Sequence, residues 1–101
     1  MNLKISLPLE KIQSFCKDHH IRKLSFFGSI LREDFGPNSD VDILVEFEKG
    51  TKIGFFRFVQ LENQLRQIIG RKVDLKTPDA LSPFFRGEVL KEAEVSYEQT
   101  K

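Results

Sequence analysis

The clearest periodicity in the chain is the alternation of hydrophobic and polar residues over positions 40–48. Hydrophobic side chains at every second position would share one face of an extended strand, and the positions between them are mostly acidic. The hydrophobic positions are Val41, Ile43, Val45 and Phe47. Shorter segments with the same alternation occupy residues 23–27 and 72–76. The sequence therefore predicts three strands.

Hydrophobic residues three and four positions apart predict two amphipathic helices, over residues 8–20 and 55–69. Gly70 supplies a common end for the second of them. A further helix is expected over residues 83–92, and a short one over residues 29–34. Taken in order, these elements predict an α/β fold, in which a small mixed sheet carries helices on one face and polar residues on the other.

Several hydrophobic residues could belong either to the core or to a surface. Phe55, Phe56 and Phe58 stand at the start of the second long helix, and we expect them to pack in the core. A surface that binds a partner is the alternative, because ten phenylalanines in 101 residues leave room for exposed ones. Cys16 lies on the hydrophobic side of the first helix and is expected to be a small core residue.

The composition excludes several classes of protein. A chain of 101 residues with 40% hydrophobic and 31% charged residues is expected to form one globular domain. Sixteen basic and fifteen acidic residues give a net charge of +1 with no basic block, so no direct binding to nucleic acid is expected. The single cysteine and the absence of an 18-residue apolar run favour a cytoplasmic protein without a membrane span.

Acidic residues on two of the predicted strands are candidate catalytic and metal-binding residues. Asp40 and Asp42 would project side by side, because positions i and i+2 of a strand share a face. Two ionised carboxylates repel each other, and a bound cation, a shared proton or a basic partner relieves the repulsion. Mg²⁺ prefers oxygen ligands and leaves positions for substrate phosphates. Asp74 lies between Val73 and Leu75, so burial of that pair would turn Asp74 toward the same face.

A glycine turn supplies a candidate binding site for the phosphates. Gly28-Ser29 would begin the short helix, where its backbone N–H groups can donate hydrogen bonds to an anion. Arg32, one helical turn later, could reach phosphate oxygens, although a role as an ordinary solvated arginine is equally expected. Together with the carboxylates, this turn indicates phosphoryl or nucleotidyl transfer, in which two metal ions stabilise the attacking and leaving oxygens.

The spacing of these residues matches a known signature. Gly28-Ser29, ten further residues and Asp40-Val41-Asp42 form the pattern G-S-x10-D-x-D, which resembles the DNA polymerase β-like nucleotidyltransferase superfamily. The resemblance extends through residues 27–35, 39–47 and 70–75. It is strongest to the minimal nucleotidyltransferases, which are stand-alone catalytic domains with a sheet of the polymerase β palm type. Residues 1–101 are expected to form one such domain.

The resemblance also implies roles for individual residues. Asp40 and Asp42 match the two metal-binding aspartates, and Gly28 and Ser29 match the turn that binds the triphosphate of ATP. Asp74 resembles the third carboxylate, which binds the catalytic metal and assists deprotonation of the attacking hydroxyl.

The same resemblance implies a partner. Minimal nucleotidyltransferases are often encoded beside a HEPN-domain protein, and in that setting they are antitoxins that transfer AMP from ATP to a tyrosine of the HEPN toxin. A complex with that partner, or a homodimer, is expected. One alternative is adenylylation of a small molecule such as an aminoglycoside, and another is an antitoxin that acts by binding alone. The sequence does not specify the nucleobase.

Overall fold

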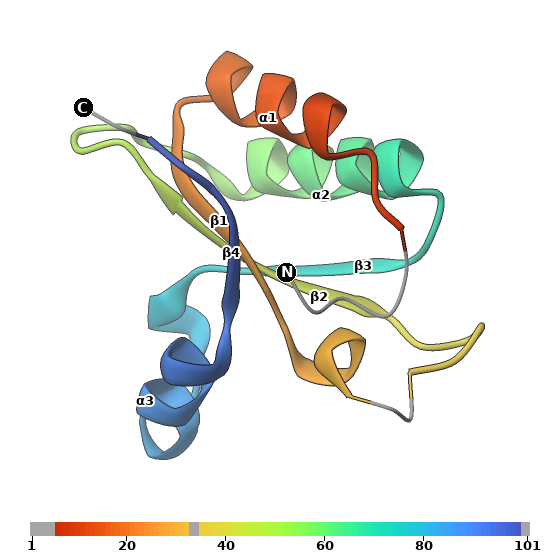
Figure 1. The fold of residues 1–101 in the computed structure, drawn as a ribbon. Helices are drawn as coiled ribbons and strands as arrows, with labels where there is room; N and C mark the ends of the chain where they lie inside the picture. The colour runs from red at the N-terminus through yellow and green to blue at the C-terminus, as the bar shows by residue number, and fades with distance from the viewer. Residues whose placement is uncertain (1–5, 33–34, 100–101) are drawn as a thin grey trace.

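The computed structural model describes residues 6–32 and 35–99, and it shows helices packed against a mixed sheet (Figure 1). The strands are β1 (Ile21–Phe27), β2 (Val41–Phe47), β3 (Val73–Lys76) and β4 (Glu94–Glu98). The helices are α1 (Leu9–Asp18), α2 (Phe55–Ile69) and α3 (Pro83–Glu92), with short 3-10 helices η1 (Gly28–Leu31) and η2 (Pro78–Ala80).

The sheet has the strand order β3-β2-β1-β4. β1 runs antiparallel to both of its neighbours, whereas β2 and β3 are parallel. A parallel pair needs a long crossover, and α2 supplies it between β2 and β3. The predicted α/β fold with a small mixed sheet is therefore confirmed.

The core lies between the sheet and the pair formed by α1 and α2, which lie side by side in Figure 1. α2 places Leu61 and Leu65 in the core, as its hydrophobic spacing predicts, and it ends at Gly70 in the left-handed conformation. Removing so much hydrocarbon from water is the main stabilising contribution to a fold of this size. α3 lies apart from α1 and α2 and contains no buried residue. No helix in the described segments is long and apolar enough to cross a bilayer.

Two features differ from the sequence-based expectation. β4 was not predicted, although Val95 and Tyr97 alternate with polar residues over a segment as long as those at residues 23–27 and 72–76; its pairing with β1 makes it a strand. The predicted helix over residues 29–34 is a four-residue 3-10 helix that ends at Leu31, and residues 33 and 34 lie outside the described segments.

The expectation that all three phenylalanines of the second helix pack in the core is wrong for two of them. Phe58 packs against the core, but Phe55 and Phe56 are 76% and 82% exposed. Phe55 and Phe56 are the first two residues of α2, and because helical side chains lean toward the N-terminus, these two point past the end of the helix. The rings of Phe55 and Phe56 instead contact each other edge to face.

Cys16 is fully buried, as predicted, and burial raises the pKa of its thiol from 9.0 to about 12. Because the thiolate is the reactive form, we expect the folded protein at about pH 8 to react very slowly with a thiol-specific reagent. The measurement is the rate of thiol modification with and without denaturant. Rapid modification of the folded protein would show that this part of the core opens readily.

Candidate active site

Asp42 and Asp74 are brought together by the sheet. In the parallel pairing of β2 with β3, Asp42 lies directly opposite Asp74. Residues directly opposite each other project from the same face, so the predicted convergence of these two carboxylates is observed. Asp40 is exposed and immediately precedes β2. The charges of Asp40 and Asp74 both act on Asp42, which places Asp42 at the centre of the acidic group.

Asp42 has a perturbed pKa. Burial raises the pKa of this half-buried carboxyl above its ordinary value, and the negative charges of Asp74 and Asp40 raise it further. Lys76 and the backbone N–H of Ser29 act in the opposite direction. Ionisation of Asp42 is therefore less favourable here than in water, and a bound cation would offset this effect.

Gly28 forms the floor of the site. β1 pairs Phe27 with Asp42, so the turn after β1 lies against the Asp42 side chain. A Cβ atom at Gly28 would overlap Oδ2 of Asp42 and lie 3.1 Å from its Cγ. Gly28 also has a φ of +76°, a conformation that side chains with a Cβ rarely adopt. Both the space and the backbone therefore require glycine here.

A hollow of about 330 Å³ opens beside this turn. Its lining residues come from the end of β1, from η1 and the residue after it, from β2 and from α3, and they are Phe27, Gly28, Ser29, Arg32, Asp42, Val89 and Glu92. Arg32 is exposed at the rim, and the Ser29 hydroxyl donates to the backbone carbonyl of Asp40 at 3.4 Å. The hollow thus brings together the predicted phosphate-binding residues and the central carboxylate. Because η1 has only four residues, it supplies little of the helix dipole on which the prediction relied.

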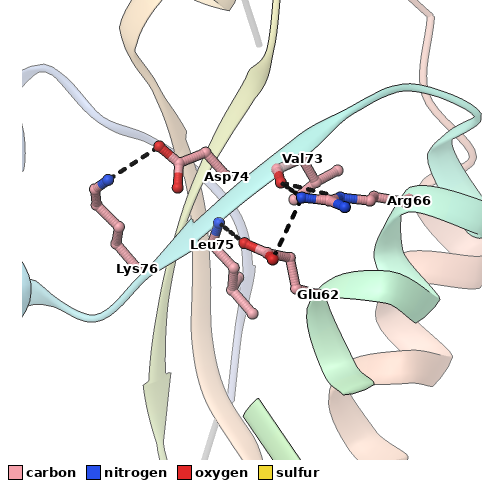
Figure 2. Close-up of polar contacts among 6 residues, drawn as sticks. All are labelled: Glu62, Arg66, Val73, Asp74, Leu75 and Lys76. Carbon is pink, nitrogen blue, oxygen red and sulfur yellow. Dashed lines mark hydrogen bonds and ion pairs between the residues drawn. The ribbon is translucent and has the colours of Figure 1, made fainter. Parts of the chain in front are cut away.

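Three residues near the site were not identified from the sequence. Lys76 donates from Nζ to Oδ2 of Asp74 at 2.9 Å (Figure 2). The i, i+2 spacing of Asp74 and Lys76 in a strand was a usable signal for this pair. Val89 and Glu92 reach the hollow from α3, and no local pattern indicates that this helix returns to the site.

The carboxylates fit a hard divalent cation by their chemistry. Mg²⁺ is usually bound by one or two carboxylates together with substrate phosphates, rather than by a complete set of protein ligands. Among the described residues, no three His, Cys, Asp or Glu side chains form a metal-binding group, so the predicted grouping of Asp40 with Asp42 and Asp74 as three metal ligands is not seen. Asp42 and Asp74 supply two neighbouring carboxylates, and Lys76 is the cation that contacts Asp74.

The sequence is similar to known nucleotidyltransferases. The profile of the family described as "Polymerase beta, Nucleotidyltransferase" matches residues 10–101. A relative from Thermococcus cleftensis, named protein adenylyltransferase MntA, is 34% identical over 94 residues, which cover 85% of this chain and 93% of the relative.

Solved structures share the fold. A toxin–antitoxin crystal structure with AMP-PNP superposes with a TM-score of 0.75 at 21% identity, over 93% of this chain and 76% of that chain. A complex of the tri-AMPylated HEPN toxin of Shewanella oneidensis with its MNT antitoxin gives a TM-score of 0.65 at 19% identity, over 90% of this chain and 70% of that chain. At these identities, the likeness establishes the fold alone.

Proposed function

The chain belongs to the polymerase beta nucleotidyltransferase family, and we propose that it transfers AMP from ATP to a tyrosine hydroxyl of a HEPN-domain toxin. The observation that carries this proposal is the register that sets Asp42 opposite Asp74 while Gly28 lies against Asp42. The named activity of the Thermococcus relative and the AMPylated HEPN toxin in the Shewanella complex support this choice of reaction and acceptor.

In this proposal, Asp40, Asp42 and Asp74 would hold one or two Mg²⁺ ions. Bound Mg²⁺ would neutralise charge on the phosphates and help the pyrophosphate to leave. Gly28 would let the backbone come close to the triphosphate. Ser29 donates its backbone N–H to Asp42 and its hydroxyl to the Asp40 carbonyl in this structure, and it would turn these donors to a phosphate on binding. These residues would orient the α-phosphate in the hollow next to Asp42.

Asp74 is the proposed acceptor of the tyrosine proton. Its Oδ2 accepts from Lys76, so Oδ1 is the oxygen that would take the proton. The tyrosine oxygen forms a bond to the α-phosphorus, while the bond from that phosphorus to the bridging oxygen of the β-phosphate breaks. AMP is then linked to tyrosine, pyrophosphate leaves, and the proton stays on Asp74 until solvent removes it.

Arg32 is the proposed cation for the phosphates at the rim of the hollow. A charge-assisted hydrogen bond from a guanidinium stabilises binding substantially, so Arg32→Gln should raise the KM for ATP about tenfold with little change in the melting temperature. Arg57→Gln is the matched control, because Arg57 is an exposed arginine that contacts His19 instead. Equal KM values for the Arg32 and Arg57 variants would remove Arg32 from the binding site.

The acceptor is tested by incubating the protein with Mg²⁺, ATP labelled at the α-phosphate, and the product of the adjacent gene. We expect label on a tyrosine of a HEPN-domain protein. Label on an aminoglycoside but on no protein would favour a small-molecule enzyme. If Asp42→Asn still neutralised the toxin as well as the unchanged protein does, binding alone would explain the antitoxin activity.

A further inference from the structure

β3 forms one edge of the sheet, and its outward backbone groups need partners. Along a strand, the backbone groups of successive residues point to opposite sides. The carbonyl of Lys72 accepts from the Val41 N–H at 2.8 Å, which directs Lys72 toward β2. The polar backbone groups of Val73 and Leu75 therefore point away from β2, toward the open edge. Backbone N–H and C=O groups at a sheet edge cost free energy when they are buried without a hydrogen-bond partner. When they are exposed, they can pair with a strand of another chain.

Two side chains of α2 satisfy two of these groups, the Val73 carbonyl and the Leu75 N–H (Figure 2). Arg66 donates to the Val73 carbonyl from Nε at 3.3 Å and from Nη2 at 3.1 Å. The Leu75 N–H donates to Oε2 of Glu62 at 2.9 Å. Glu62 and Arg66 are one helical turn apart and pair with each other at 3.4 Å. The Glu62–Arg66 pair thus occupies the place where a further strand would bind.

The contacts of this pair lie on both sides of Asp74. Val73 and Leu75 are the chain neighbours of Asp74, so hydrogen bonds join the β3 backbone to α2 immediately before and immediately after Asp74. α2 is a firm support, because Leu61 and Leu65, each next to a member of the pair, are fully buried. β3 has only four residues, and its pairing with β2 on one side alone would leave its other side unsupported.

We propose that Glu62 and Arg66 are positioning residues, which keep the β3 backbone fixed so that the Asp74 carboxylate stays opposite Asp42. This inference rests on the proposed role of Asp74 in catalysis. Reacting groups must be held within about 0.5 Å of a productive geometry, and partners that orient metal-binding carboxylates commonly change activity about 10- to 100-fold. Neither residue touches the hollow that would hold the nucleotide.

The test compares Glu62→Ala with Glu62→Gln and with Gln67→Ala. Glutamine retains an oxygen that can accept from the Leu75 N–H, whereas alanine does not. Gln67 is an exposed residue on the same helix and serves as the matched control. Hydrogen exchange of the Leu75 amide reports the contact directly. The kcat and the KM for ATP, measured with the HEPN partner and corrected for the folded fraction, report its consequence.

We expect Glu62→Ala to speed exchange at Leu75 and to lower kcat at least about tenfold, with the KM for ATP within about twofold. Glu62→Gln should restore most of the kcat, and Gln67→Ala should change neither quantity. Unchanged exchange in Glu62→Ala would overturn the proposed contact. Faster exchange with an unchanged kcat would overturn the positioning role. If the unchanged protein transfers no AMP, the proposed function fails, and the exchange rates still decide whether Glu62 fixes β3.

Discussion

Replacement of Asp42 by Asn is expected to lower the rate of AMP transfer by about 10³-fold while leaving the protein folded. Asp42 lies at the centre of the site, since it faces Asp74 across the sheet and contacts the Gly28 turn. Asparagine keeps the shape of the side chain but removes the negative charge that would bind a cation. The measurement is the rate of labelling of the proposed HEPN-domain partner, with circular dichroism and thermal unfolding as controls for folding.

Asp42→Asn is expected to lower activity without lowering stability. The pKa of Asp42 is raised in the folded state above its ordinary value of 3.8, so folding favours the protonated carboxyl. The stabilising contribution of Asp42 to the free energy of unfolding is therefore fully present below the pKa of this carboxyl in the unfolded chain. It is lost as the pH rises through the pKa of Asp42 in the folded protein. Near pH 7 and without divalent cations, the melting temperature of Asp42→Asn should equal or exceed that of the unchanged protein. The difference in melting temperature should become smaller at about pH 3.

Asp79→Asn is the matched control, because Asp79 is exposed and does not line the hollow. It should retain activity. If Asp42→Asn were active, or if it unfolded at a much lower temperature, Asp42 would have a structural role instead of a catalytic one.

Gly28→Ala should lose both stability and activity. The left-handed backbone conformation of Gly28 costs a residue with a Cβ about 1–2 kcal/mol, and the added methyl group would overlap the Asp42 carboxylate. Relief of that overlap must move either the turn or Asp42. We therefore expect the free energy of unfolding to fall by more than the backbone cost alone, and AMP transfer to fall by at least about 100-fold, because small displacements of reacting groups have effects of this size.

Gly50→Ala separates the two causes. Gly50 has a similar φ of +86°, but a Cβ atom there would meet nothing within 4 Å. It should show the backbone cost of about 1–2 kcal/mol and retain the rate of AMP transfer per folded molecule. Chemical denaturation and labelling of both variants make the comparison. Equal losses of stability and activity in the Gly28 and Gly50 variants would contradict the account of Gly28 as the floor of the site.

The parts of the fold that the sequence predicts well are those governed by local periodicity. The alternation around Val41, Ile43 and Val45 locates β2, and the spacing of Leu61 and Leu65 locates α2. The pattern G-S-x10-D-x-D also identifies the enzyme class correctly, since the family match confirms a nucleotidyltransferase.

Features that depend on tertiary contacts could not be predicted in the same way. The assignment of β4 required knowledge that the end of the chain pairs with β1. The contact of Glu62 with the Leu75 N–H joins residues thirteen positions apart, and it follows from the packing of α2 beside an open sheet edge. The exposure of Phe55 likewise depends on where α2 begins relative to the core, because its spacing from Phe58 is that of a buried stripe. The proposed catalytic roles of the site residues remain predictions.

The most direct test of the central proposal compares two labels on ATP, one at the α-phosphate and one at the γ-phosphate, with Mg²⁺ and the HEPN partner. Nucleotidyl transfer leaves the α label on the partner and releases the γ label with pyrophosphate. We predict α label on a tyrosine of the partner, no γ label there, and loss of the α label in Asp42→Asn. Transfer of the γ label to the partner, or α labelling that persists in Asp42→Asn, would contradict the proposal.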